Sequence, residues 1–247
     1  MRLLQINVWM GRLTRQLLPF IESYQPDIIT TQEMFSADGN VGLPDNTFHL
    51  LDLVKQAGSY EHVYFSPTYE AVYAGVTVGC GNAILSRYPL RHREMFFTNG
   101  EFQKFDVSAV FESNIRNAQV VSVELPAGQL SVVNHHGYWE PNPTGSEKTV
   151  ACMAKVAERI RGLNGPLLLA GDLNINPGTP AMKLFEGLLE DLTATYNVGD
   201  TLSVLGKVPG VAPDHILIND GVVVKDFRVL NELVSDHKAL LLDFDIG

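Results

Sequence analysis

The chain has 247 residues, 45% of them apolar and 19% charged, which provides apolar material for a continuous core and excludes an intrinsically disordered protein. Its formal net charge of −10 at pH 7 disfavours a protein that coats nucleic acid, because phosphate binding usually needs a surplus of Lys and Arg. A nuclease is not excluded, since a divalent cation can supply positive charge at its site.

Strands and helices alternate in the first part of the predicted order. An apolar run at residues 3–8 predicts a buried strand, and a helix from about Thr14 should end before Pro26. The elements expected next are a strand over residues 26–33, a loop over 36–46, a helix over 48–57, an extended segment over 62–65 and a short strand over 82–86. Residues 69–81 are rich in Gly and Tyr and have no clear pattern.

Strands predominate in the second part. They are predicted near residues 94–98, 118–124, 130–134, 167–170, 215–218, 222–229 and 240–244. A helix over 146–162 has apolar residues at helical spacing, and another is expected to begin near Thr179-Pro180, where a capping residue precedes a Pro. The sequence has no repeat or linker. It therefore indicates one domain over residues 1–247, with two packed sheets and about four helices outside.

The cysteines and the first residues indicate a cytoplasmic setting. Cys80 and Cys152 are far apart, have no metal-type spacing, and are expected to be reduced core residues. The chain enters a strand pattern from its first residues without a signal peptide, and no apolar run approaches membrane-spanning length. We therefore expect a cytoplasmic monomer without a transmembrane segment.

Polar residues suited to phosphate or metal chemistry gather at the ends of the predicted strands. The clearest case is Gly171-Asp172-Leu173-Asn174. Because strand side chains alternate between faces, we expect Asp172 and Asn174 to point the same way. A carboxylate beside a carboxamide suits a hard metal ion, its water or a phosphate oxygen. The other polar strand ends are Asn7, Glu33, Asn82, Asn134-His135-His136, Asp214-His215 and Asp236-His237.

The order of these segments resembles the endonuclease/exonuclease/phosphatase superfamily, whose fold is that of deoxyribonuclease I. The matching segments are Gln5-Ile6-Asn7-Val8, Thr31-Gln32-Glu33, Gly81-Asn82-Ala83-Ile84-Leu85-Ser86, Val133-Asn134-His135-His136, Gly171-Asp172-Leu173-Asn174-Ile175-Asn176-Pro177, Asp214-His215-Ile216-Leu217 and Ser235-Asp236-His237. The resemblance implies an α+β fold, a four-layer α/β/β/α sandwich of two mainly antiparallel sheets with outer helices. It also implies hydrolysis of a phosphate ester with Mg²⁺ or Mn²⁺ as the cofactor.

The resemblance also implies which residues hold the metal ion and activate water. Glu33 would be the principal metal ligand, with Asn7 beside it and Asp236 near the ion. Asp172 would orient or deprotonate the attacking water. Oxygen ligands of this kind suit a hard ion better than zinc, because the sequence has no Cys cluster and no His-x-x-x-His motif.

The remaining roles concern the phosphate and the proton. Asp214 would pair with His237 and favour its protonated form, which can contact phosphate. His136 matches the family's first catalytic histidine, although its neighbour His135 leaves this choice open. Asn174 would hold a phosphate oxygen. Asn82 and Tyr138 are further candidates for substrate binding.

The substrate and some alternatives stay open. A phosphate ester could be a small molecule, a lipid headgroup or a nucleic acid, and an endonuclease acting on DNA or RNA is the nearest alternative. Trp9 stands where abasic-site nucleases of the family carry an acid, which disfavours that branch. Acidic balance favours a small or lipid-like substrate. An alternative of a different class is a binding domain that keeps the fold without catalysis. Whether one or two metal ions bind is also open.

Overall fold

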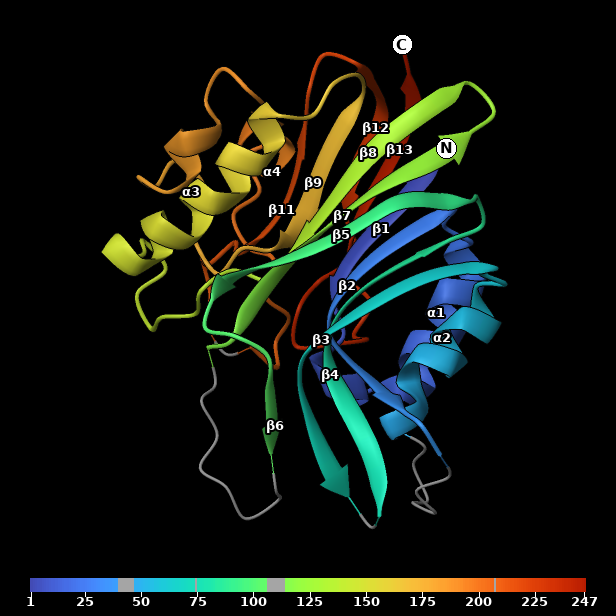
Figure 1. Ribbon diagram of the computed structural model, residues 1–247. Coiled ribbons are helices and arrows are strands. Elements are labelled where there is room, and N and C mark those ends of the chain that lie inside the picture. Colours follow the sequence, from blue (N-terminus) through green and yellow to red (C-terminus); the bar gives the residue numbers. More distant parts are fainter. Residues whose placement is uncertain (40–46, 74, 106–113, 207) are drawn as a thin grey trace.

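Two β-sheets pack face to face, and helices cover the outer side of each sheet (Figure 1). The computed structural model describes residues 1–39, 47–73, 75–105, 114–206 and 208–247. Strand neighbours are antiparallel except for the parallel pairs β1–β2, β3–β6 and β8–β9, so both sheets are mixed. This is the predicted α+β sandwich.

The first sheet has the strand order β12-β13-β1-β2-β4-β3-β6. Its strands are β1 (Arg2–Asn7), β2 (Ile28–Ala37), β3 (His62–Tyr73), β4 (Val76–Ser86), β6 (Gln103–Phe105), β12 (Val222–Val229) and β13 (Leu240–Ile246). The N-terminal strand β1 is therefore central, between β13 from the end of the chain and β2.

The second sheet has the order β10-β11-β9-β8-β7-β5. Its strands are β5 (Leu90–Asn99), β7 (Arg116–Leu125), β8 (Gly128–His135), β9 (Leu167–Asp172), β10 (Glu190–Asp191) and β11 (Asp214–Ile218). Asp214 pairs with Asp172 in the ladder between β11 and β9, so these two acids come to the same edge of the sheet.

Helices form the outer layers. The first sheet is covered by α1 (Thr14–Tyr24) and α2 (Leu50–Ala57), and the second by α3 (Glu147–Arg161), with α4 (Leu192–Thr195) near β11 (Figure 1). Short 3-10 turns are η1 (Trp9–Gly11), η2 (Thr47–His49) and η3 (Met182–Phe185). Helix α3 begins where predicted because the Ser146 hydroxyl caps the backbone N–H of Lys148. Within the described ranges, we find no helix that is both long and apolar enough to cross a membrane.

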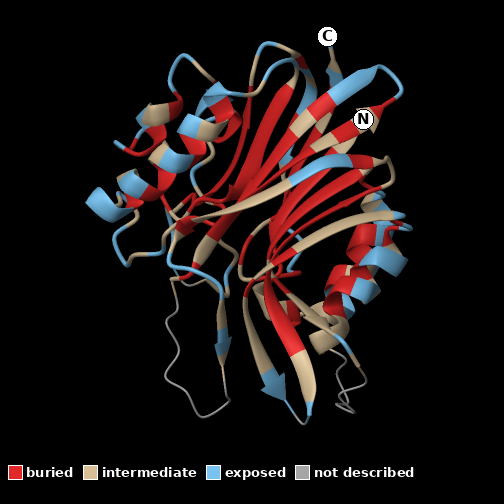
Figure 2. Ribbon diagram, in the orientation of Figure 1, coloured by how far each residue is buried: buried red, intermediate tan, exposed pale blue. Residues whose placement is uncertain are grey.

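Apolar side chains fill the three spaces between the four layers. Leu3, Ile84, Val121 and Leu168 are among those that pack between the sheets, because alternate residues of each strand face inward. Separate clusters lie under α1 and α2 and under α3. Figure 2 shows buried residues along the strands of both sheets and on the inward sides of the helices. This framework holds the strand ends rigidly in place.

A buried polar network crosses the sandwich between the two sheets. Gln32 Nε2 of β2 donates to Asn134 Oδ1 of β8 over 2.7 Å. Asn134 Nδ2 in turn faces the Oε1 atom of Gln119 at 2.9 Å and the backbone oxygen of Ala83 at 3.0 Å. Buried amides are stable only when they are hydrogen-bonded, so this network fixes how the two sheets meet.

Some local predictions were wrong. The helix predicted near Thr179-Pro180 is the short 3-10 turn η3, which begins at Met182. Residues 62–65 are extended as predicted and begin β3, whereas residues 69–73 and 76–81, which had no clear pattern, belong to the antiparallel pair of β3 and β4, which bulges between Pro67 and Tyr69. The bulge interrupts the alternation that sequence patterns reveal. In the predicted loop, Ser36 and Ala37 instead extend β2, and residues 40–46 lie outside the described residues.

Candidate active site

A pocket of about 690 Å³ collects polar side chains from several strand ends. Both sheets contribute to it, through β2, β3 and β4 of the first and β7 and β9 of the second, together with the segment after β8 and the loop before β13. The polar side chains considered below are Glu33, Asn82, Arg116, His136, Asp172, Asn174, Asp236 and His237. Most of the residues singled out in the sequence are therefore neighbours in space.

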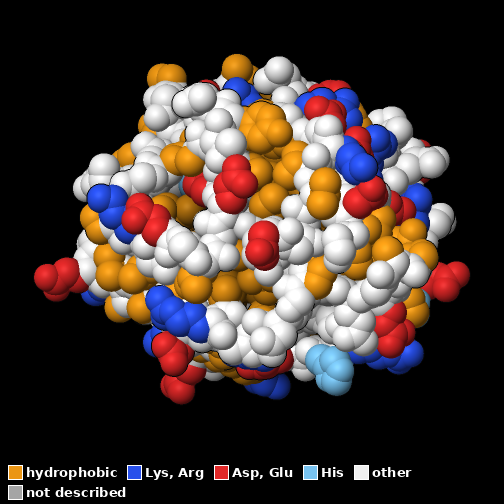
Figure 3. Space-filling model, turned by 90° about the horizontal axis from the view of Figure 1, so that it is seen from above, with side chains coloured by type: hydrophobic (Ala, Val, Ile, Leu, Met, Phe, Trp, Pro, Cys, Tyr) orange, Lys and Arg blue, Asp and Glu red, His pale blue; other side chains and the backbone are white. Residues whose placement is uncertain are grey.

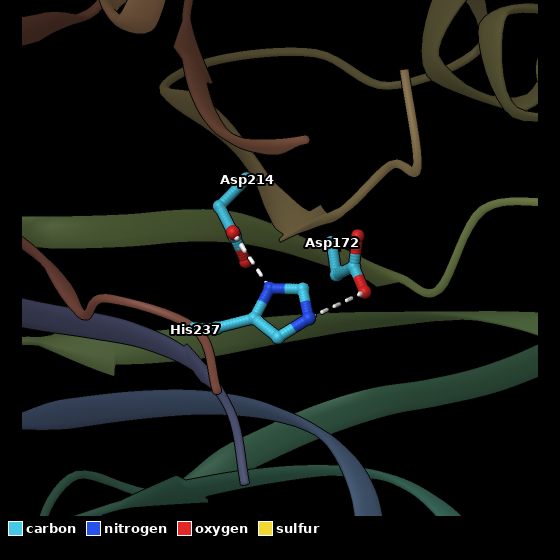
Figure 4. Close-up of side chains that lie close together, drawn as sticks. All are labelled: Asp172, Asp214 and His237. Carbon is cyan, nitrogen blue, oxygen red and sulfur yellow. Dashed lines mark hydrogen bonds and ion pairs between the residues drawn. The ribbon is translucent and has the colours of Figure 1, made fainter. Parts of the chain in front are cut away.

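His237 lies between two buried carboxylates (Figure 4). Its Nδ1 atom is 2.8 Å from Asp214 Oδ2, and its Nε2 atom is 3.7 Å from Asp172 Oδ2. Burial opposes a charge on the ring, but the two acids outweigh this effect and raise the pKa of His237 well above its ordinary value. The two acids therefore favour the protonated ring, in which Nδ1 donates to Asp214.

Asp172 ends β9 at the centre of the pocket. Burial opposes its ionisation, yet His237 and His136 together hold the pKa of this carboxyl well below its usual range. Its Oδ2 atom is 3.4 Å from Nε2 of His136 and accepts a hydrogen bond from Asn7 Nδ2 over 3.0 Å. Asp172 is thus an ionised acceptor held by three side chains.

Glu33 reaches the pocket because β2 is bulged. The register between β2 and β4 shifts between Thr31 and Met34, and Glu33 has a φ of +55°. Left-handed backbone is unfavourable for a non-glycine residue, and bulges of this kind often redirect a side chain at a functional site. Asn7 Nδ2 donates to Glu33 Oε1 over 3.2 Å and so links Glu33 to Asp172.

Asn7 and Asp236 complete this group of acids and amides. Asn7 Oδ1 accepts a hydrogen bond from the backbone N–H of Trp9, so the side chain is held at both ends. The Ser235 hydroxyl donates to the backbone oxygen of Asn7 and lies 3.1 Å from Asp236 Oδ1. Burial raises the pKa of Asp236, His237 opposes this change, and the nearby charge of Glu33 raises it further.

The donors present fit a hard divalent cation. Glu33, Asp172 and Asp236 bring three carboxylates to one pocket, and a cation would offset the repulsion between Glu33 and Asp236. Atoms of Asp172, Asp214 and His237 also lie within 4.8 Å of one another, so this group is a second set of residues that could hold a metal ion. Burial raises the pKa of the pocket thiol Cys80 to about 12, so in the absence of a metal ion it is a protonated thiol.

Asn174 reaches the pocket from a turn. The sequence predicted that Asn174 and Asp172 point the same way, but the reason given, alternation along a strand, does not apply to Asn174. Strand β9 ends at Asp172, and Asn174 has a φ of +59°. Asp172 Oδ1 accepts from the backbone N–H of Asn174 over 3.1 Å, which is the Asx-turn geometry typical of aspartate. Asn174 Nδ2 then donates to the backbone oxygen of Gly137 over 3.0 Å.

The structure separates the two neighbouring histidines. His136 lines the pocket, whereas His135 is fully buried and its Nδ1 atom lies 3.0 Å from the backbone oxygen of Asn117. Burial lowers the pKa of His135 to about 4, despite the contact with Asn117. His136 is therefore the histidine that can reach a substrate.

Two other candidates for substrate binding differ in position. Asn82 lines the pocket and donates from Nδ2 to Asn117 Oδ1 over 2.9 Å. Tyr138 is outside the described lining, and its ring faces Lys148, whose Nζ atom is 5.7 Å from the ring centroid. The next residue, Trp139, lines the pocket instead.

Arg116 is a residue of the pocket that the sequence did not reveal. Its Nε atom donates to the backbone oxygen of Gly137 over 2.7 Å, the same oxygen that accepts from Asn174. Burial lowers the pKa of the guanidinium, while Glu33 and Asp172 oppose this effect. Arg116 precedes a predicted strand in an ordinary sequence context, which gives no signal for a site.

Comparisons with known proteins bear on the family and the fold of the chain. A model described as the Endonuclease/Exonuclease/phosphatase family matches residues 4–237. No curated protein matches the sequence. An endonuclease/exonuclease/phosphatase from Beutenbergia cavernae has a similar structure, with a TM-score of 0.74 and 20% identity over 100% of this chain and 71% of that chain.

Two further solved structures carry more specific names. A mannosyl-6-phosphatase from Bacteroides thetaiotaomicron has a TM-score of 0.74 and 17% identity, with 100% of both chains covered. The human nocturnin catalytic domain with bound sulfate has a TM-score of 0.68 and 18% identity, covering 100% of this chain and 94% of that chain. At these identities the structural likeness shows the fold alone.

Proposed function

The chain belongs to the endonuclease/exonuclease/phosphatase family, and on this premise we propose that it hydrolyses phosphate esters with the help of Mg²⁺ or Mn²⁺. One observation carries the proposal. His237 stands between Asp214 and Asp172, at the wall of a pocket that also contains Glu33 and Asp236. Imidazole and carboxylate groups in one pocket can transfer a proton, and a protonated imidazole can stabilise the negative charge that develops on the phosphate oxygens.

Glu33, Asp172 and Asp236 would hold the metal ion, with Asn7 keeping two of these carboxylates in place. When bound, a divalent ion offsets the negative charge of the phosphate and lowers the pKa of water. The Asn7 amide nitrogen donates to Glu33 and Asp172, and its oxygen accepts from the backbone N–H of Trp9. We therefore propose that Asn7 orients the metal ligands.

The other residues bind the substrate and direct the water molecule. Asp172 accepts a hydrogen bond from the attacking water and so aligns it with phosphorus. His237 donates from Nε2 to a phosphate oxygen, and Asp214 holds its ring in the orientation that this requires. His136 is the second imidazole at the phosphate. Arg116 and Asn174 from the side of the second sheet, and Asn82 from β4 of the first, surround the remaining phosphate oxygens.

A phosphatase or phosphodiesterase is favoured over a nuclease. One similar structure is named a mannosyl-6-phosphatase, which acts on a small phosphate ester by its name. Among the described side chains that line the pocket, Arg116 is the one Lys or Arg, against four acids. On the face of the molecule that Figure 3 shows, Lys and Arg side chains lie in small groups beside Asp and Glu.

The experiment is hydrolysis of bis(4-nitrophenyl) phosphate and 4-nitrophenyl phosphate, followed by release of nitrophenolate. We expect turnover with Mg²⁺ or Mn²⁺ and its loss with EDTA. An absence of turnover on both esters and on plasmid DNA would favour the alternative of a binding domain that has kept the fold. Activity that survives complete removal of divalent ions would disprove the metal requirement.

A further inference from the structure

Two loops contribute apolar side chains to the pocket, which also contains the acids and imidazoles. We call this apolar set the apolar wall, and it consists of Trp139, Pro141, Pro143, Leu202, Val208 and Val211. The first three residues come from the loop after β8 and the last three from the loop before β11. Trp139 and Val208 remain 52% and 51% exposed, so they offer apolar surface to a ligand.

The two loops that form the apolar wall are fastened to the catalytic segment by Asn176. Its backbone N–H donates to the backbone oxygen of Pro143 over 2.8 Å. Its Oδ1 atom accepts from the backbone N–H of Ala212 over 2.9 Å. Because Asn176 follows Asp172 and Asn174 so closely, both loops are held at a fixed position relative to the acids.

Trp139 has an additional anchor. Its backbone N–H donates to Asn114 Oδ1 over 3.0 Å, and its backbone oxygen accepts from Asn114 Nδ2 over 3.1 Å. This two-way pair fixes the backbone while the indole stays half exposed. An exposed aromatic ring on a fixed backbone loses little conformational entropy when it binds a ligand, which makes it an effective contact for an apolar group.

The loop of Leu202 is also tied to the residues beside the acids. The backbone N–H of Ser203 donates to the backbone oxygen of Asp236 over 2.7 Å. The backbone N–H of Lys238 donates to the backbone oxygen of Thr201, also over 2.7 Å. The apolar wall is therefore built into the same framework as Asp236 and His237. It is a preformed part of the pocket, of the kind that recognises the organic part of a small ligand.

We infer that the substrate is a small phosphate ester whose organic group is apolar and packs against the apolar wall while its phosphate faces His237. The inference rests on the proposed function and specifies its substrate class. Burial of each methylene of such a group against the wall would strengthen transition-state binding up to about fourfold. A polar sugar phosphate would cover less of this apolar surface than an alkyl group does.

A series of alkyl 4-nitrophenyl phosphates tests the inference directly. With Mg²⁺ present, the methyl, butyl and hexyl esters share one leaving group and one charge, so they differ in apolar area alone. We expect kcat/KM of the wild-type protein to rise from methyl to hexyl by at least thirtyfold. In Trp139→Ala and in Val208→Ser, this hexyl-to-methyl ratio should fall by about fivefold or more, because less apolar surface remains.

Tyr196→Ala is the matched control. Tyr196 is 49% exposed and lines a different depression beside β12, so its loss should leave the ratio unchanged. A wild-type ratio near one, with the methyl ester turned over, would overturn the inference and leave the proposed function intact. If none of the esters is turned over under any metal condition, the proposed function itself fails.

A binding measurement separates these outcomes further. Hexyl phosphate should shift the tryptophan fluorescence of the wild-type protein to shorter wavelength, and Trp139→Phe should lose this shift. Methyl phosphate should cause none. Equal spectra with hexyl phosphate and methyl phosphate would contradict packing against Trp139 whether or not the esters are hydrolysed.

Two further assays distinguish a free amphiphile from a membrane lipid as the source of the ester. Hexyl 4-nitrophenyl phosphate is presented as a monomer in solution, and the hexadecyl ester is presented in phosphatidylcholine vesicles. Faster turnover in solution supports a free amphiphile, and faster turnover in vesicles supports a lipid. Faster turnover of thymidine 5′-(4-nitrophenyl) phosphate than of the hexyl ester would overturn the apolar assignment.

Discussion

Asp214 Oδ2 accepts a hydrogen bond from Nδ1 of His237 over 2.8 Å, although the two residues are 23 positions apart in the chain. The same carboxylate oxygen is bonded to the hydroxyl of Thr201 over 2.8 Å. Asp214 is outside the described lining of the pocket, so it can affect the reaction only through His237. We therefore regard Asp214 as a positioning residue.

Asp214→Asn should lower kcat for bis(4-nitrophenyl) phosphate by about a hundredfold, because the neutral amide neither fixes the ring of His237 nor stabilises its charge. KM should change little. Circular dichroism should show a folded protein, and Asp220→Asn, at an exposed acid between β11 and β12, is the control. Wild-type kcat in Asp214→Asn would contradict the role.

Glu33→Gln should weaken metal binding. Removing one charge from the three carboxylates should raise the Mg²⁺ concentration for half-maximal activity about tenfold or more, since even residues that only orient metal ligands have effects of that size. The measurement is a metal titration of nitrophenolate release after EDTA treatment. Glu61→Gln, at an exposed acid before β3, should titrate like the wild type. An unchanged titration in Glu33→Gln would remove Glu33 from the metal site.

Arg116→Gln should raise KM for 4-nitrophenyl phosphate about tenfold and weaken inhibition by inorganic phosphate by the same factor, because a charge-assisted hydrogen bond to the phosphate is lost. Arg116→Lys keeps the charge without the planar fork and should give an intermediate KM. If Arg116 serves only to hold the Gly137 oxygen, kcat should fall in both variants while KM and phosphate inhibition stay constant.

The stability of the protein should fall in mild acid because of His135. Its pKa is about 4 in the folded state and about 6.5 in the unfolded chain. Between these values the unfolded chain binds a proton that the folded state does not, so stability present above pH 6.5 is lost as the pH falls towards 4. The linked loss is on the order of 3 kcal/mol.

Urea unfolding at pH 7 and pH 4 measures this effect. His135→Gln removes the titrating ring, so the variant should lose about 3 kcal/mol less than the wild type between the two pH values. His215 has the opposite sign: although burial opposes its charge, Asp191 raises its pKa, so it stabilises the fold in acid. It is present in both proteins and cancels. Equal losses in the two proteins would show that His135 is not a buried neutral ring.

Asn134→Ala should disrupt the polar network between the sheets. Removal of the amide takes the Asn134 donor away from Gln119 Oε1 and one acceptor away from Gln32 Nε2, although Gln32 keeps Gln5 and Gln119 Nε2 keeps Tyr64, and an unsatisfied buried group costs about 1–3 kcal/mol. The free energy of unfolding in urea should therefore fall by about 3 kcal/mol. Gln129→Ala, at an exposed position of the same strand, should stay within about 0.5 kcal/mol. A similarly small effect in Asn134→Ala would show that the network is dispensable.

The periodic spacing of apolar residues predicted the helices and strands that bury one face. The helix expected over residues 146–162 is α3, because its apolar residues repeat at helical spacing and Ser146 caps it. The buried runs ending at Asn7 and before Asp172 are β1 and β9. The resemblance gave the layer order, and the polar strand ends gave most of the residues of the pocket.

Local irregularities in the backbone were not predictable. Glu33 enters the pocket from a bulge with a φ of +55°, and Asn174 enters from a turn with a φ of +59°. Strand patterns assume regular alternation, and they carry no information about a residue at which alternation stops. Arg116 was missed for a related reason: its role depends on a carbonyl at Gly137, and a backbone oxygen has no sequence signature.

The sequence alone determined most of the strands and helices and the polar residues that end several strands, because these depend on the spacing of apolar residues along one segment. The tertiary structure decided that His237 meets Asp214 and Asp172, that His136 rather than His135 faces the pocket, and that two loops form an apolar wall. These relationships join residues that are far apart in the chain. They are fixed by sheet register and packing, which no single segment encodes.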